Sequence, residues 1–134
     1  MRRKNLIVKR KVENKNLPNT KLKIKKIYQK FRTIISNNIG QNNFALGVSG
    51  GSDSLCLAYF SKLYTSEFKN KMYVLIVNHN LRKESYKESL KVKKILKKNK
   101  IESKILHWRG RVPKSNVQST ARNIRYSLIA EFCA

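Results

Sequence analysis

The sequence has few cysteines, few acidic residues and no long apolar run, and each shortage argues against a class of protein. Its two cysteines, Cys56 and Cys133, belong to no Cys-x-x-Cys pair and no Cys/His cluster, so neither a disulfide framework nor a zinc or iron–sulfur site is expected. No run of about 18 apolar residues occurs, so we expect no membrane span. The apolar stretch Leu6–Val8 is too short for a signal peptide, although an organellar transit peptide stays open. We therefore expect a cytoplasmic protein without a membrane partner.

The shortage of acidic residues leaves the chain strongly basic. Lys and Arg number 31 against 7 Asp and Glu, and the net charge is +24. Such a charge attracts polyanions and predicts salt-sensitive binding of nucleic acid. A competing explanation is a genomic bias toward Lys and Asn, which places the same residues on any surface. With 134 residues the chain forms at most one domain and is short for an enzyme with two substrates.

The spacing of apolar residues predicts alternating helices and strands. Residues 1–20 carry charge without periodicity and are predicted to be a loose basic arm, so that the domain covers 21–134. Between Leu22 and Ile35, spacings of three and four predict a helix that Thr20 caps and the Asn-rich stretch around Gly40 closes. The other predicted elements are strand 44–48, a helix from 55, strand 72–77, a helix through 90–96, strand 101–106 and a helix over 117–132. This order predicts an α/β fold, a parallel twisted sheet with helices on both faces.

A polar loop follows each of the three predicted strands. The loops are Ser49–Ser54, Asn78–Arg82 and His107–Ser115. Ligands of parallel sheets bind outside the carboxyl ends of the strands. These loops are therefore predicted to lie along one edge of the sheet and to form the site.

The first loop, Ser49–Ser54, reads Ser-Gly-Gly-Ser-Asp-Ser and has the composition of an anion site. Its glycines tolerate positive φ, its hydroxyls form hydrogen bonds, and the helix that follows presents free N–H groups. It lacks the Lys of a Walker P-loop and the third Gly of a dinucleotide fingerprint, which disfavours both. An ordinary Ser- or Asp-capped helix stays the alternative. Asp53 repels a phosphate directly, so we predict that it acts through Mg²⁺ on a pyrophosphate leaving group.

Three further side chains are candidates for the site. His79 follows the second strand and can stack on or hydrogen-bond a nucleotide, although a single histidine at such a place is more often structural. Arg122 and Arg125 lie one helical turn apart, off the apolar stripe, and can project in one direction. The alternative interpretation is that both arginines lie on a solvated helix face. Tyr126, beside them, can simply pack at the edge of the core.

Three segments together resemble one enzyme family. Val48–Ser54 resembles the pyrophosphate-binding loop of the N-type ATP pyrophosphatases. Val77–Ser85 is similar to the Val-Asp-His-Gly-Leu-Arg-x-Glu-Ser segment of the tRNA(Ile)-lysidine synthetases, and Asn116–Tyr126 to their Asn-x-Gln-x-x-Ala-Arg-x-x-Arg-Tyr helix. The resemblance covers about residues 40–134. It implies an adenine nucleotide alpha hydrolase-like (PP-loop ATPase) fold that is incomplete at the C-terminus.

The resemblance implies a ligase that forms a C–N bond while ATP is cleaved to AMP and pyrophosphate. Enzymes of this family adenylate the wobble cytidine of tRNA(Ile) with a CAU anticodon, and free L-lysine attacks the activated base to form lysidine. By this resemblance ATP is bound by Ser49, Gly50, Gly51, Ser52, Asp53 and Ser54, the adenosine lies near Val77, Asn78 and His79, and the catalytic or substrate-facing residues are Asp53, Arg122 and Arg125. Asp53 is the Mg²⁺-linked residue. A homodimer of the full-length protein is a further expectation.

The sequence departs from the family in two residues and at its end. Asn78 replaces the usual Asp and Asn80 the usual Gly, and loss of the carboxylate can remove a polar contact to the nucleotide. After Ala134 the family continues with a strand and an Ala-His-His-x-x-Asp-Asp-x-x-Glu-Thr-like segment, whose acids are expected to bind lysine or metal. We therefore expect an N-terminal part, marginally stable because of an unpaired sheet edge, that cannot complete catalysis alone. A tRNA thiolase, an ammonia-using synthetase and an inactive basic nucleic-acid-binding fragment stay open.

Overall fold

The computed structural model describes residues 22–134, in two parts that divide after Asn38. The predicted basic arm and the Thr20 cap lie outside the described residues. The first part contains helix α1 (Leu22–Asn38), in which Tyr28 is buried and stacks on Phe31 with ring centroids 6.2 Å apart. The predicted helix is therefore present.

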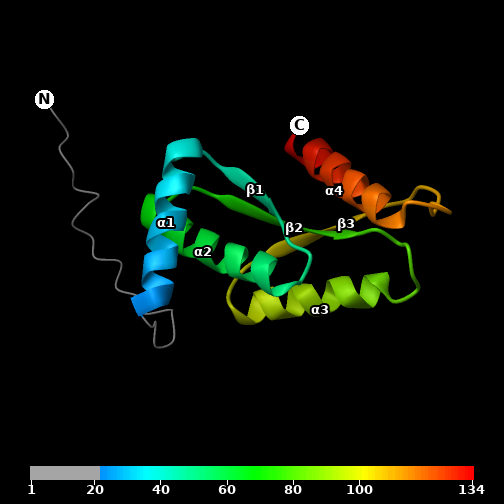
Figure 1. Ribbon diagram of the computed structural model, residues 1–134, viewed down its shortest axis with the longest axis horizontal. Helices are drawn as coiled ribbons and strands as arrows, with labels where there is room; N and C mark the ends of the chain where they lie inside the picture. The colour runs from blue at the N-terminus through cyan, green and yellow to red at the C-terminus, as the bar shows by residue number, and fades with distance from the viewer. Residues whose placement is uncertain (1–21) are drawn as a thin grey trace, which may run out of the picture. The chain divides into compact units, whose positions relative to one another are not determined.

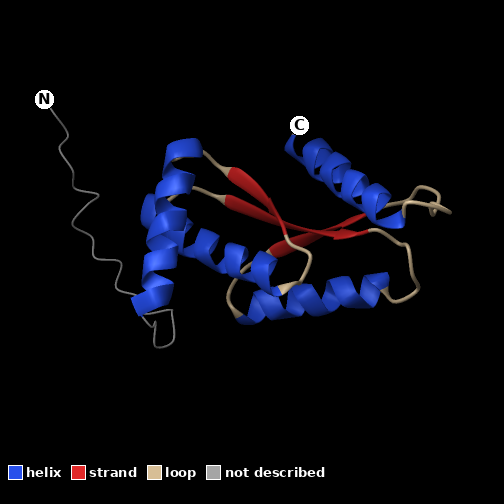
Figure 2. Cartoon of the chain, in the orientation of Figure 1, coloured by secondary structure: helices blue, strands red, loops and turns tan. Residues whose placement is uncertain are grey.

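The second part, residues 39–134, alternates strands and helices in the predicted order. The elements are β1 (Phe44–Gly47), α2 (Ser52–Phe68), β2 (Met72–Asn78), α3 (Ser85–Lys98), β3 (Ser103–His107) and α4 (Val117–Cys133). Figure 2 shows the three strands side by side, with α2, α3 and α4 of the same part around them. The α/β class is confirmed. Within residues 22–134, no helix has the length and apolar content needed to cross a bilayer.

The sheet is parallel and has the order β1-β2-β3. At its carboxyl edge the Val48 N–H donates to the Leu75 carbonyl at 2.8 Å, and the Trp108 N–H donates to the Asn78 carbonyl at 2.9 Å. Pairing thus continues to the residues at which the loops begin. The loops after the three strands start from the same edge, as the sequence predicts.

Helices cover both faces of this sheet, which confirms the second part of the fold prediction. Helices α2 and α3 contact β2 on one face and α4 contacts β1 and β2 on the other, as Figure 1 shows. The face under α2 and α3 holds the apolar core, which consists of Val48, Ala58, Val74, Ile76, Val92, Leu96 and Ile101. On the opposite face Tyr73 meets Phe132 of α4 with ring centroids 5.9 Å apart. The alternation of β2 side chains between the faces explains its unbroken apolar sequence.

Two boundaries differ from the predictions by two residues or more. Helix α2 begins at Ser52 rather than Leu55, because the first turn of a helix needs no apolar contact and Ser and Asp are favoured there. Strand β3 covers Ser103–His107 rather than 101–106. Ile101 is buried in the core although it precedes the strand, so its apolar character reports packing and not extended structure.

Candidate active site

The loop between β1 and α2 turns sharply at Gly50, which has φ = 94°. This is the left-handed region that glycine occupies at little cost. A Cβ on Gly50 would lie 2.4 Å from Cγ2 of Val92, a buried residue of α3, whereas one on Gly51 would meet nothing nearer than 3.8 Å. The turn therefore requires glycine at Gly50 and only tolerates it at Gly51.

Hydrogen bonds within the loop fix its shape and leave the start of α2 open. The Ser54 hydroxyl donates to the Gly51 carbonyl at 3.0 Å and accepts from the Gly50 N–H at 3.2 Å. It lies 3.3 Å from the Ser49 hydroxyl. No side chain caps α2 among the described residues, so its first N–H groups stay available for an acceptor. Free N–H groups and the helix dipole make this terminus suited to a phosphate.

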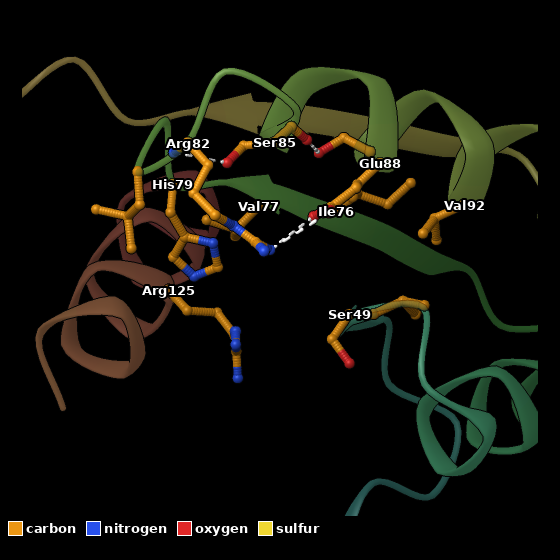
Figure 3. A pocket seen from close by; sticks show the side chains of 12 residues that line it. Ser49, Ile76, Val77, His79, Arg82, Ser85, Glu88, Val92 and Arg125 are labelled. Atoms are coloured by element: carbon orange, nitrogen blue, oxygen red, sulfur yellow. Dashed lines mark hydrogen bonds and ion pairs between the residues drawn. The ribbon is translucent and has the colours of Figure 1, made fainter. Parts of the chain in front are cut away.

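A cavity of about 220 Å³ lies at the carboxyl edge of the sheet, beside this loop. Val48, Ile76 and Val92 give it an apolar floor that is continuous with the core. Polar groups come from the loops after β1 and β2 and from α3 and α4. Figure 3 shows His79 and Arg125 together on one side, with Ser49 on the other side in this view. The cavity thus combines an apolar surface with a few converging polar groups, as small-molecule sites do.

His79 and Arg125 interact electrostatically inside the cavity. The pKa of His79 is lowered, first by burial and then by the Arg125 guanidinium, while a hydrogen bond with the Ala121 backbone opposes the shift. The imidazole is therefore neutral at pH 7. Its Nε2 is buried and has no hydrogen-bond partner among residues 22–134. A neutral ring with an unused nitrogen can bind a polar group of a ligand.

Only one of the two predicted arginines lines the cavity. Arg125 does so, whereas Arg122 places its guanidinium over the Tyr126 ring, 5.5 Å from the centroid. Both Arg122 and Tyr126 are exposed. The two arginines lie on the same side of α4 but have different surroundings, so their roles can be separated by mutation.

Asn78, predicted to neighbour the adenosine, directs its side chain away from the cavity. The residue is 2 % exposed. Its Nδ2 lies 3.2 Å from Nδ1 of His107, and its Oδ1 accepts the Asn80 N–H at 3.1 Å. Asn80 has φ = 55° and its amide donates to the Trp108 carbonyl at 3.1 Å. Asn78 and Asn80, the two departures from the family pattern, thus belong to one hydrogen-bond network that joins the loop after β2 to the loop after β3. Asparagine adopts the left-handed conformation found at Asn80 more readily than most residues.

Replacing Asn78 by alanine is expected to lower the free energy of unfolding by about 1–3 kcal/mol, because the buried partners of its amide lose their hydrogen bonds. Urea unfolding followed by circular dichroism measures the change. The matched control is Asn123→Ala, at an exposed position of α4 without a described side-chain partner, which is expected to leave stability within about 0.5 kcal/mol. Equal effects of the two substitutions would contradict the network.

Asp53, the predicted Mg²⁺-linked residue, is exposed in the first turn of α2 and does not line the cavity. Among residues 22–134 there is no cluster of three or more His, Cys, Asp or Glu that could hold a metal ion. One carboxylate fits Mg²⁺ that arrives with phosphate oxygens and keeps several waters, which is its usual mode with nucleotides. It does not fit a preformed metal centre.

Sequence reasoning missed several residues that line the cavity. Arg82 and Ser85 belong to a segment that the sequence singled out, but no role was assigned to them. The Ser85 hydroxyl accepts the backbone N–H of Arg82 at 3.1 Å, and the Arg82 guanidinium forms an ion pair with Glu88 at 3.1 Å. Ser85, Glu88, Ser89 and Val92 all line the cavity from α3. Their spacing of three and four residues is the signal that points to one face of this helix.

The geometry defines a class of protein: a parallel α/β domain with a Ser- and Gly-rich loop after its first strand and a small cavity with polar groups beside it. The model of the PP-loop domain matches residues 18–134. The chain therefore belongs to the PP-loop family.

Curated relatives show which members of the PP-loop family the chain is similar to. The chain is 41% identical over 86 residues to the tRNA(Ile)-lysidine synthase of Bartonella quintana (strain Toulouse), which covers 63% of this chain and 18% of that one. It is 33% identical over 110 residues to that of Rickettsia typhi (strain ATCC VR-144 / Wilmington), covering 80% and 26%. The resemblance deduced from the three motifs is confirmed. The chain spans less than a third of the length of these relatives.

Two solved structures share the fold. The U34-tRNA thiolase NcsA from Methanococcus maripaludis, solved with its [4Fe-4S] cluster, superposes with a TM-score of 0.65 at 26% identity over 78% of this chain and 38% of that one. The NH3-dependent NAD synthetase from Campylobacter jejuni gives a TM-score of 0.50 at 20% identity, over 82% and 50%. The second likeness concerns the fold alone. The adenine nucleotide alpha hydrolase-like fold is thus confirmed.

Proposed function

We propose that this chain is the ATP-binding part of a tRNA(Ile)-lysidine synthetase. The observation that carries the proposal is the cavity beside the loop Ser49–Ser54, in a chain whose curated relatives at 33–41% identity are lysidine synthases. The thiolase alternative is disfavoured because that relative is more distant, at 26% identity. We place the reaction in the cytoplasm, and a homodimer stays a prediction.

The two halves of the site suit different parts of ATP. The cavity of about 220 Å³ is smaller than the roughly 300 Å³ or more of a drug-sized site, so it suits a base and not a whole nucleotide. The triphosphate then extends over the start of α2, where free N–H groups and the Ser49 hydroxyl donate to its oxygens, while Ser54 holds the loop in shape. When bound, Mg²⁺ neutralises charge on the leaving pyrophosphate, and Asp53 is the residue that would hold it.

Two residues of the cavity have proposed roles in adenylation of the cytidine. Arg125 stabilises the negative charge on the α-phosphate oxygens while the base oxygen attacks the phosphorus. Neutral His79 offers its unpartnered Nε2 as a hydrogen-bonding group to the nucleotide. Attack by the lysine ε-amine on the activated base then releases AMP and leaves a new C–N bond. Arg122, stacked on Tyr126 at the surface, is assigned to the substrate side of the site and not to the cavity.

Isothermal titration with ATP tests the proposal. The chain is expected to bind ATP in the presence of Mg²⁺. Asp53→Asn is expected to weaken this binding about tenfold, which corresponds to roughly 1.4 kcal/mol, because the variant loses the attraction between the carboxylate and the bound cation. In EDTA the variant is expected to bind ATP at least as well as the parent chain, because without the cation the Asp53 carboxylate only repels the phosphates. Glu131→Gln, which removes an exposed acid of α4, is the charge-matched control and is expected to change nothing.

Two outcomes contradict the proposal. The first is no detectable binding of Mg-ATP by a folded chain. The second is equal binding by the parent chain and Asp53→Asn in Mg²⁺. The tRNA and lysine steps are tested separately by mass spectrometry of tRNA(Ile) after incubation with ATP and lysine, in which an added lysine residue identifies lysidine.

A further inference from the structure

Helix α3 has one face that packs against the sheet and the cavity and an opposite face that is exposed and basic. Ser85, Ser89 and Val92 face the cavity and the sheet. The opposite face carries lysines at spacings of four, three and four residues: Lys87, Lys91, Lys94 and Lys98. All four are exposed. We call these four residues the α3 lysine face.

The charges of the α3 lysine face are unpaired within residues 22–134. None of its four ammonium groups has a hydrogen bond or ion pair with another residue in the described part of the chain. Of the two acids at this end of the helix, Glu88 is already paired with Arg82 and Glu84 precedes the first turn. The C-terminal half of α3 has no acid at all.

The four lysines on one face lower the stability of α3. Their presence is therefore not explained by a contribution to helix formation. Lys87–Lys91 and Lys94–Lys98 are like-charge pairs four residues apart, and each is unfavourable by about 0.2–0.5 kcal/mol. Lys87 also puts positive charge in the first turn, where the helix dipole disfavours it. Only Lys98 lies in the last turn, where a cation is favourable. A polyanionic partner would offset this repulsion.

We propose that the α3 lysine face binds the sugar–phosphate backbone of an RNA strand. The four lysines extend over roughly 16 Å at 1.5 Å per residue, a length over which a nucleic-acid strand presents several phosphates. An RNA held on this helix lies against the element whose inner face lines the cavity. The inference deepens the proposed function, because it assigns this chain a contact to its tRNA substrate outside the catalytic site.

An anionic membrane is a weaker candidate for the same charge. Helices that lie on membranes insert an apolar face and keep their cations at its borders. The apolar face of α3 is instead buried against the sheet, where Val92 and Leu96 belong to the core. The lysines project from the side opposite that face. Leu90 and Ile95 of α3 are exposed, but five residues of spacing place them on different sides of the helix, so they form no single apolar face for a bilayer to bury.

Fluorescence anisotropy with a labelled RNA stem-loop, over a range of KCl concentrations and without ATP or lysine, tests the inference. The variant K87Q/K91Q/K94Q/K98Q is expected to bind at least tenfold more weakly at low salt. The slope of log affinity against log salt is expected to flatten by about 3, since each phosphate contact contributes about −0.7 to −0.9. The matched control, K23Q/K25Q/K26Q/K30Q, removes the same charge from exposed positions of α1 and is expected to lose much less.

Three results would overturn the inference: unchanged RNA affinity in the α3 variant, equal losses in both quadruple variants, or loss of binding to phosphatidylserine vesicles without loss of RNA binding. Circular dichroism confirms that the variants are folded. Titration with Mg-ATP separates this inference from the proposed function. A parent chain that binds RNA through α3 but not ATP would refute the proposed function alone, and an α3 variant with intact ATP and RNA binding would refute the inference alone.

Discussion

Replacing Gly50 by alanine is expected to destabilise the domain by about 1–3 kcal/mol and to weaken ATP binding at least tenfold. The native φ of 94° is strained for any residue with a Cβ, and the new atom would lie 2.4 Å from a methyl group of Val92. Val92 is buried and its β-branched side chain has little freedom to rotate away. The loop must therefore move, and the N–H groups that meet the phosphates move with it.

Gly51→Ala is the control for this prediction. Gly51 has φ = −68° and ψ = 159°, which any residue adopts. A Cβ on Gly51 would come no nearer than 3.8 Å to another atom, so it fits without a clash. Its substitution is expected to leave the free energy of unfolding within about 0.5 kcal/mol. Urea denaturation and titration with Mg-ATP measure the two effects. Gly50→Ala with the stability and ATP affinity of the parent chain would show that the turn is not needed in this conformation.

Replacing Arg125 by glutamine is expected to weaken ATP binding about 10- to 100-fold, because hydrogen bonds to a charged group contribute about 1.5–3 kcal/mol. Arg122→Gln is the matched control on the same helix. Its guanidinium lies over the Tyr126 ring and not in the cavity, so its loss is expected to change ATP affinity less than about twofold. Equal losses in the two variants would contradict the separate surroundings of the two arginines.

Arg125→Gln has a second expected effect, on His79. Because the Arg125 charge lowers the pKa of His79, its removal is expected to raise that pKa toward the ordinary value, while burial keeps it below. A histidine with a lowered pKa makes the fold less stable as pH falls through its ordinary pKa, since the unfolded chain takes up the proton first. The variant is expected to show a weaker loss of stability in this range. NMR titration of the His79 ring, compared between Arg125→Gln and Arg122→Gln, measures the shift.

The sequence by itself determined the order of elements, the parallel sheet and the position of the loop. Apolar spacing reports helix faces, unbroken apolar runs such as that of β2 report strands covered on both sides, and Ser-Gly-Gly-Ser-Asp-Ser reports the turn between a strand and a helix. These signals are local, because each depends on residues within about one or two turns of one another. The motif resemblance added the family.

Only the tertiary structure decided which of the candidate residues meet. Arg122 and Arg125 look equivalent in the sequence, yet only Arg125 lines the cavity, because the packing of α4 against the sheet decides which of its side chains reaches the site. Asn78 looks like a nucleotide contact but is satisfied by His107, which is 29 residues away. The α3 face of the cavity and the requirement for Gly50 both depend on Val92, which packs against the loop from a distant part of the chain. Contacts of this kind depend on packing between elements, and no pattern within a single element encodes them.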